Sequence, residues 1–77
     1  MNLSQIGRFI SQRRAALGLT QAQLAQRLDV TDKAVSKWER GKSLPDTALL
    51  SRVAAELRVS VVELLSGEAM NVARSSN

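Results

Sequence analysis

The apolar residues of this chain recur three and four positions apart in several separate segments, the spacing of one face of an α-helix. In the clearest segment, Leu49, Leu50, Val53, Ala54 and Leu57 follow that spacing closely. The strict alternation of apolar and polar residues that marks a half-buried strand is not found. The pattern therefore predicts an all-α fold, a compact domain of five helices with short connections.

Residues that favour the two ends of a helix flank these segments. Three pairs have the spacing of a capping box: Asn2 with Gln5, Thr20 with Gln23, and Ser60 with Glu63. Thr31 and Asp46 can cap the other two helices. We expect the first helix at about 3–17, the third at about 32–40, and the fifth to end at Leu65. Gly7 lowers helix propensity inside the first helix, which indicates close approach by a neighbouring segment.

The length of 77 residues allows one domain. The helical pattern extends over residues 1–67, whereas residues 68–77 are polar and lose the period. We therefore expect a domain at 1–67 and a C-terminal tail or linker at 68–77.

Positive charge is concentrated in the first half of the chain. The net charge is +4, but residues 1–42 hold eight basic and three acidic residues, and residues 43–77 hold three basic and four acidic ones. One strongly positive side suits a polyanionic partner. An ordinary solvated surface is the alternative that net charge alone leaves open.

Composition argues against several classes of site. The chain has no cysteine and no histidine, so we expect neither disulfides nor a metal, and no cofactor. No apolar run approaches the ~20 residues of a membrane span, and a cytoplasmic protein that does not interact with membranes is the expectation. An enzyme is not expected, because the usual nucleophile and base combinations are missing. RNA binding is disfavoured because Phe9 and Trp38 both fit the core, which leaves no aromatic residue for base stacking.

The stretch QAQLAQRLDVTDKAVSKW combines two short helices and a tight turn. Leu24 and Leu28 lie four apart on one face of the first helix, and Val35 and Trp38 lie three apart on one face of the second. The second helix then presents polar residues outwards, and this arrangement favours DNA binding. These residues are Asp32, Lys33, Ser36 and Lys37.

Four segments occur in the order IGRFISQRR, LGLTQAQLAQRL, VTDKAVSKWERGKSLPD and VSVVELLSGE. In sequence and spacing they resemble the lambda-repressor-like, Cro-type helix-turn-helix domains of bacteria and their phages, over Ile6 to Glu68. The resemblance implies a five-helix domain with the helix-turn-helix at helices 2 and 3. It also implies a transcriptional regulator, expected to be a repressor, that binds double-stranded DNA as a homodimer on a palindromic operator.

The resemblance further implies a recognition helix at about 32–40, lying in the major groove. Base contacts are expected from Asp32, Lys33, Ser36 and Lys37. Whether each lysine contacts a base or a phosphate stays open, and Asp32 has the alternative of only favouring the helix N-terminus. Phosphate contacts are expected from Gln21, Thr31, Arg40, Lys42 and Ser43.

Arg14 and Glu39 are expected to have a structural role. In the family, residues at these two positions form a salt bridge between the first helix and the end of the recognition helix. Arg14 is therefore interpreted as a structural residue, although it could pass for another phosphate contact.

Three residues depart from the family's pattern. Asp29 occupies a turn position that most often holds glycine, and we expect positive φ there. Arg13 stands where leucine is common, and its head is expected to stay in water. Val62 replaces a common acidic residue. With Leu65 it is a candidate dimer contact, and an ordinary partly buried valine is the alternative.

A second class of function stays open. The chain could be a protein-interaction module, such as an antitoxin or anti-repressor, that uses its helical domain or tail. The sequence fits an intact small regulator, and it equally fits the N-terminal domain of a longer protein whose C-terminal effector domain is missing here.

Overall fold

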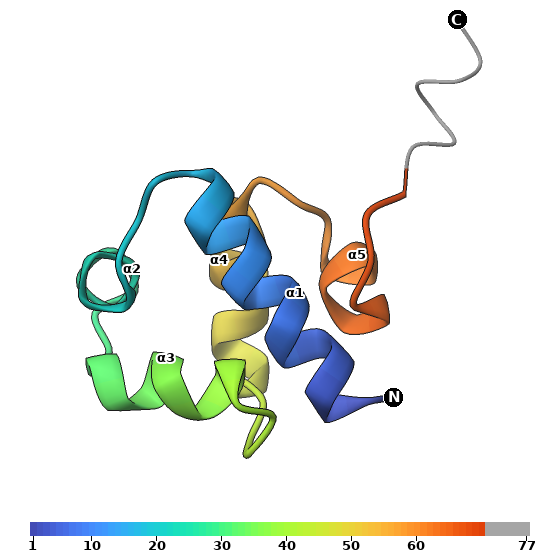
Figure 1. The fold of residues 1–77 in the computed structure, drawn as a ribbon, viewed down its shortest axis with the longest axis horizontal. Coiled ribbons are helices and arrows are strands. Elements are labelled where there is room, and N and C mark those ends of the chain that lie inside the picture. The colour runs from blue at the N-terminus through green and yellow to red at the C-terminus, as the bar shows by residue number, and fades with distance from the viewer. Residues whose placement is uncertain (71–77) are drawn as a thin grey trace, which may run out of the picture.

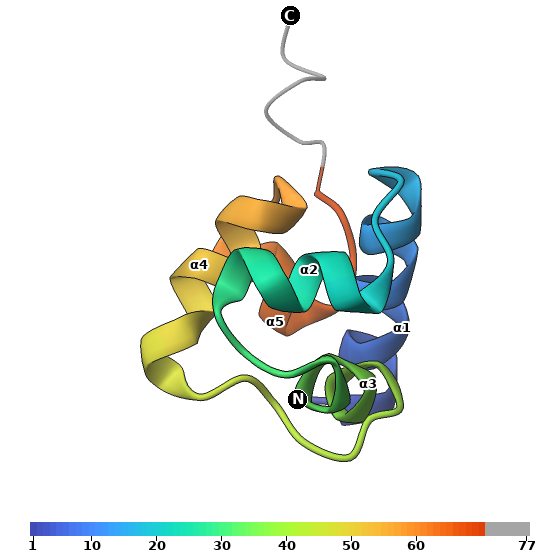
Figure 2. The same cartoon turned by 90° about the vertical axis from the view of Figure 1, so that its left-hand side faces the viewer.

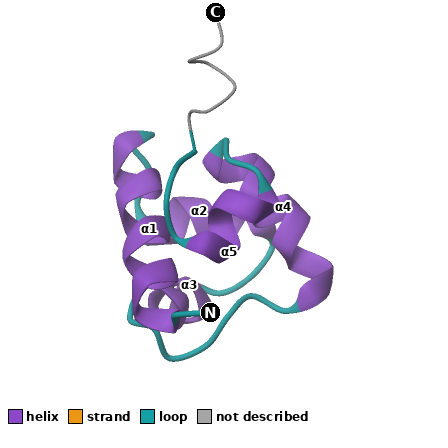
Figure 3. Cartoon of the chain, turned by 90° about the vertical axis from the view of Figure 1, so that its right-hand side faces the viewer, coloured by secondary structure: helices purple, strands orange, loops and turns teal. Residues whose placement is uncertain are grey.

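The computed structural model describes residues 1–70 and contains five α-helices (Figure 1). No strand occurs in this range, as Figure 3 shows, and the predicted all-α fold is confirmed. The helices are α1 Leu3–Ala16, α2 Gln21–Leu28, α3 Asp32–Glu39, α4 Thr47–Leu57 and α5 Val61–Ser66. No helix of the described range is long and apolar enough to cross a membrane.

Helix ends differ from the predictions by one residue in three places. α1 ends at Ala16 instead of 17, α3 ends at Glu39 instead of 40, and α5 continues to Ser66. In the first two cases the last expected residue has become the C-cap, with φ −90° at Leu17 and φ −88° at Arg40. Most of the tail predicted for 68–77 lies outside the described residues.

Side-chain caps hold the helix starts where they were predicted. Thr20 and Gln23 form a reciprocal capping box at α2, with bonds of 2.8 and 3.0 Å, and Ser60 and Glu63 form another at α5. Asn2 departs from this pattern, because its Oδ1 accepts from the Gln5 N–H at 3.0 Å without a full capping box around α1. Each cap satisfies N–H groups that a helix leaves unpaired at its start.

All five helices contribute to one core. Its largest fully buried side chains are Ile6, Ile10, Leu24, Leu28, Val35, Val53, Leu57 and Leu64. α1 packs against α3 and α5, and α2 packs against α3 and α4. In Figure 2, α2 crosses above α3, which lies at the lower edge of the molecule. Burial of these apolar faces fixes α3 at the surface with one side covered and the other free.

Gly7 lies where α1 meets the C-terminal end of α3. A Cβ placed there would lie 2.5 Å from the Trp38 carbonyl oxygen and 2.7 Å from the Glu39 carbonyl oxygen. These are backbone atoms, so a side-chain rotation could not relieve the contact. The close approach predicted from this glycine is confirmed, and it sets the spacing of α1 and α3.

The turn between α2 and α3 has left-handed backbone at Asp29, with φ 59° and ψ 43°, and the predicted positive φ is confirmed. Aspartate adopts this conformation at some cost, because its Cβ crowds the backbone. Arg58 has the same conformation at the end of α4, with φ 61°, and the sequence did not indicate it.

The prediction that the head of Arg13 stays in water is wrong. Its Nε and Nη2 donate to the Leu57 carbonyl oxygen at 3.1 and 2.9 Å. The guanidinium thereby satisfies a carbonyl that the C-terminal end of α4 leaves unpaired. Arg13 thus fastens α1 to α4, which a leucine could do only through apolar contact.

Candidate nucleic-acid interface

The outer side of α3 is a polar helix face that carries two exposed lysines. Val35 and Trp38 are buried, Ala34 packs against the core beside them, and the polar residues 32, 33, 36 and 37 lie on the other side of the helix. The structure brings all four predicted base-contact residues to that outer side. Asp32, Lys33 and Lys37 are exposed, and Ser36 is half-buried. In Figures 1 and 2, α3 lies at the edge of the molecule with no helix below it.

The loop after α3 adds cationic side chains beside this face. Arg40 and Lys42 are exposed, and Ser43 is half-buried. The loop is held in place because the Lys42 N–H donates to the Lys37 carbonyl oxygen at 2.9 Å. Arg40 Nε donates to the Ser36 carbonyl oxygen at a longer 3.3 Å, which places its guanidinium beside the outer face.

Two helix starts complete the arrangement. Thr31 is exposed, and its Oγ1 accepts from the Ala34 N–H at 3.1 Å, so its hydroxyl hydrogen can still donate to an external acceptor. Within residues 1–70, the structure gives the N–H groups of Gln21 and Ala22 no acceptor. Unpaired N–H groups at a helix start, with the positive end of the helix dipole, favour an anion.

Arg14 and Glu39 form an ion pair between α1 and the end of α3. Arg14 Nε lies 2.6 Å from Glu39 Oε2, and Nη2 donates to Oε1 at 3.0 Å. The Arg14 and Glu39 side chains are only 17% and 5% exposed. The hydrogen bond to Glu39 raises the pKa of Arg14 above its ordinary value, and burial opposes this shift. Arg14 therefore stays charged at any physiological pH.

The ion pair has two further partners that the sequence did not indicate. Arg14 Nη1 donates to the Leu19 carbonyl oxygen at 2.7 Å, and Gln21 Nε2 donates to Glu39 Oε1 at 2.9 Å. Gln21 and Glu39 are 18 positions apart on different helices, so no local pattern could reveal their contact. The first bond joins α1 to the loop just before α2, and the second joins the start of α2 to the end of α3.

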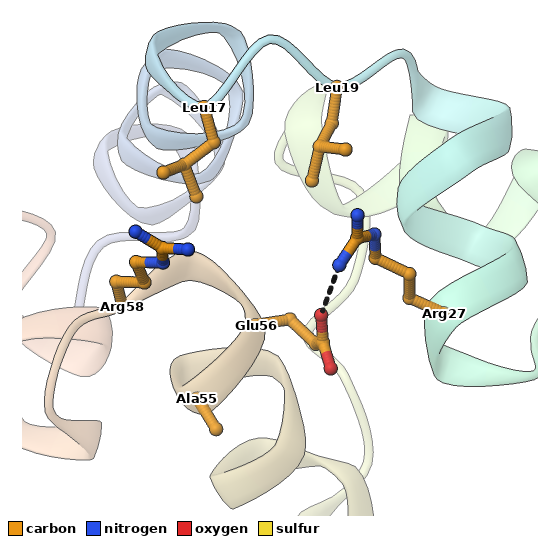
Figure 4. Close-up of a pocket in the computed structure, with 6 residues that line it drawn as sticks. All are labelled: Leu17, Leu19, Arg27, Ala55, Glu56 and Arg58. Atoms are coloured by element: carbon orange, nitrogen blue, oxygen red, sulfur yellow. Dashed lines mark hydrogen bonds and ion pairs between the residues drawn. The ribbon is translucent and has the colours of Figure 1, made fainter.

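A shallow cavity of about 160 Å³ lies between the α1–α2 loop, α2 and the end of α4 (Figure 4). Its lining includes Arg27, Glu56 and Arg58, with Leu17 and Leu19 opposite. Arg27 and Glu56 form a loose ion pair of 3.5 Å across one side. None of the predicted site residues lines this cavity.

The candidate dimer contact lies on α5, which Figure 3 shows beside α1 and α4. Val62 is 61% exposed, so it is not the partly buried valine of the alternative interpretation. Leu65 is half-buried. The two residues therefore offer a small apolar surface on a helix separate from α3.

Comparison with known proteins identifies the class. Residues 10–64 match the helix-turn-helix family model, and the chain belongs to this family, in its lambda-repressor-like, Cro-type branch. The P22 c2 repressor, solved in complex with a synthetic operator, is 33% identical with a TM-score of 0.78; the match covers 82% of this chain and 96% of that one.

Two other relatives are regulators. The clp gene regulator ClgR of Corynebacterium glutamicum is 28% identical with a TM-score of 0.76, over 87% of this chain and 71% of that one. The HTH-type transcriptional activator BcrR of Enterococcus faecalis is 44% identical over 59 residues, which are 77% of this chain. The match spans only 29% of the length of BcrR.

Proposed function

We propose that this chain binds double-stranded DNA in a sequence-specific manner and regulates transcription, with α3 as the recognition helix in the major groove. The observation that carries the proposal is the outer face of α3, where Lys33 and Lys37 are exposed and uncovered by the rest of the fold. Lysine donates to the O6 and N7 acceptors of guanine, which only the major groove displays together. Ser36 can donate or accept beside them, and Asp32 can accept from cytosine N4.

The phosphate contacts are proposed on both sides of this helix. Gln21 and Thr31 supply neutral donors at two helix starts, and Arg40 and Lys42 supply cations, with Ser43 beside them. Each phosphate neutralised by a cation adds about 0.9 to the slope of log K against log salt. The two cations, Arg40 and Lys42, would therefore lower affinity on the order of tenfold per subunit between about 50 and 200 mM salt.

The test begins by selecting duplexes from a random DNA pool with the purified chain. Half-sites about 34 Å apart, or a multiple of that spacing, would indicate a two-fold pair of domains on a palindromic operator. Lys33→Ala with Lys37→Ala should then weaken binding to the selected duplex and relax its sequence preference. Arg40→Ala is the matched control, because loss of a phosphate contact weakens binding to all duplexes alike and lowers the salt slope by about 0.9. Unchanged affinity and preference in a folded double variant would refute the proposal.

The homodimer is proposed to form through Val62 and Leu65 on α5. Their apolar surface is small for a stable interface, so we propose association on DNA in preference to a tight dimer in free solution. Repression, by occupation of an operator, is the proposed direction of regulation. A reporter gene placed behind the selected sequence tests it, and increased expression would instead show activation.

If the chain is instead a protein-interaction module, a different result is expected when its binding to the selected duplex is measured on a filter. Such a protein would retain no duplex on a filter at low salt, and about 200 mM added salt would have no effect to measure. Salt-sensitive retention of the selected duplex would distinguish the two classes.

A further inference from the structure

Glu39 binds a residue of the proposed DNA interface in addition to its ion-pair partner. Gln21 Nε2 donates to Glu39 Oε1 at 2.9 Å, the same oxygen that accepts from Arg14 Nη2 at 3.0 Å. The Glu39 side chain is almost completely buried, whereas Gln21 is half-buried at the first position of α2. The Glu39 carboxylate therefore binds the Gln21 amide on the side that faces the protein interior.

This bond restricts how the amide can face its surroundings. The planar amide carries two N–H donors on one nitrogen and an acceptor oxygen on the other side. When one N–H is bound to Glu39, the second N–H has a fixed direction. A flip of the amide would put the Gln21 amide oxygen against the Glu39 carboxylate oxygen, and two acceptors repel each other. Hydrogen bonds to a carboxylate are stronger than neutral ones, so this orientation is favoured before any ligand arrives. A donor ordered in advance loses less entropy on binding.

We propose that the Arg14–Glu39 ion pair is a positioning device that aims an N–H of Gln21 at a DNA phosphate. The inference rests on the proposed function, because it needs DNA binding and a phosphate contact at Gln21. Arg14 acts twice in this device. It holds the carboxylate, and its Nη1 bonds the Leu19 carbonyl oxygen at 2.7 Å, two residues before Gln21. One ion pair thus fixes both the side chain and the backbone at the start of α2.

The experiment removes the pair without leaving a buried charge. Arg14→Met with Glu39→Met keeps the net charge and replaces the ion pair by apolar side chains, an exchange that other proteins tolerate with little loss of stability. Gln21→Ala is then introduced into the wild-type chain and into this double variant. Arg13→Met is the matched control background, because Arg13 makes an equivalent pair of bonds from the same helix to the Leu57 carbonyl oxygen. Affinity is measured for a selected duplex of about 20 base pairs, enough for two half-sites one turn apart.

In the wild-type and Arg13→Met backgrounds, we expect Gln21→Ala to weaken binding about tenfold, the effect of losing one hydrogen bond to a charged group. The salt slope should not change, because the amide is neutral. In the double variant, the same substitution should weaken binding less than about twofold, since the amide is no longer aimed. If the double variant does not fold, Arg14→Leu with Glu39→Leu replaces it in the same comparison, because it likewise removes the acceptor for Gln21 and leaves no buried charge.

The outcomes separate the inference from the function beneath it. An equal loss on Gln21→Ala in all backgrounds overturns the positioning role and leaves DNA binding intact. No loss in the wild-type chain overturns the phosphate contact of Gln21, and the positioning role with it. Failure of the wild-type chain to select any duplex overturns the proposed function itself.

Discussion

Glu39→Ala is the substitution for which the structure gives the most definite stability prediction. It removes both bonds from the carboxylate to Arg14 and the bond from Gln21, and it leaves the guanidinium with only the Leu19 carbonyl oxygen. The Arg14 side chain is only 17% exposed, so water recovers little of what is lost. Breaking a buried pair in this way costs about 3–5 kcal/mol. A domain of this size has roughly 4–12 kcal/mol of total stability, so the loss is a large share.

The assay is thermal unfolding followed by circular dichroism. For a domain of this length each 1 kcal/mol shifts Tm by about 4–8 °C, so even the lower estimate predicts a fall of about 12 °C or more. Glu56→Ala is the matched control, since its pair with Arg27 is 3.5 Å long and the two side chains are 57% (Arg27) and 34% (Glu56) exposed. An exposed pair contributes about 0–1 kcal/mol. Arg14→Met with Glu39→Met should bring Tm back towards the wild-type value.

The pH dependence follows from the raised pKa of Arg14. A basic group with a raised pKa in the folded state contributes stability at every pH below its ordinary pKa, and that contribution is lost only as pH rises through the raised value. The Arg14 contribution should therefore be constant through the neutral range and disappear only in strongly alkaline solution.

A Tm for Glu39→Ala within a degree or two of wild type would refute the reasoning about the buried pair.

Three further predictions concern the fold and its assembly. Gly7→Ala should destabilise the chain by about 1–3 kcal/mol in urea unfolding, because the new Cβ would overlap backbone carbonyls of α3. Helix propensity alone would make this variant more stable, and that result would contradict the prediction. Asp29→Gly should stabilise by up to about 1 kcal/mol, because glycine adopts φ 59° freely; a lower Tm would show that the aspartate side chain contributes there. Val62→Lys should leave Tm unchanged, because the side chain is 61% exposed, and should abolish pairing of two chains on a selected duplex in sedimentation; unchanged pairing removes α5 as the dimer contact.

Much of the fold could be predicted because its signals are local. Caps at Thr20, Thr31, Asp46 and Ser60 act within three residues of the positions they mark, and helical periodicity places Leu24, Val35 and Leu57 in the core. The outer face of α3 follows from the same argument, since a helix that buries Val35 and Trp38 must expose Lys33 and Lys37. Two of the three errors of one residue at helix ends arose where the last expected residue became the C-cap.

The sequence alone therefore determined the helices, their apolar faces and the polar side of α3, because each depends on residues within one or two turns of one another. Only the tertiary structure decided which polar groups meet. Arg13 reaches a carbonyl 44 positions away, and Gln21 reaches a carboxylate 18 positions away. Such partners depend on how the helices cross. The crossing is set by packing of the whole core and by the close contact at Gly7, and neither can be predicted from a single segment of the chain.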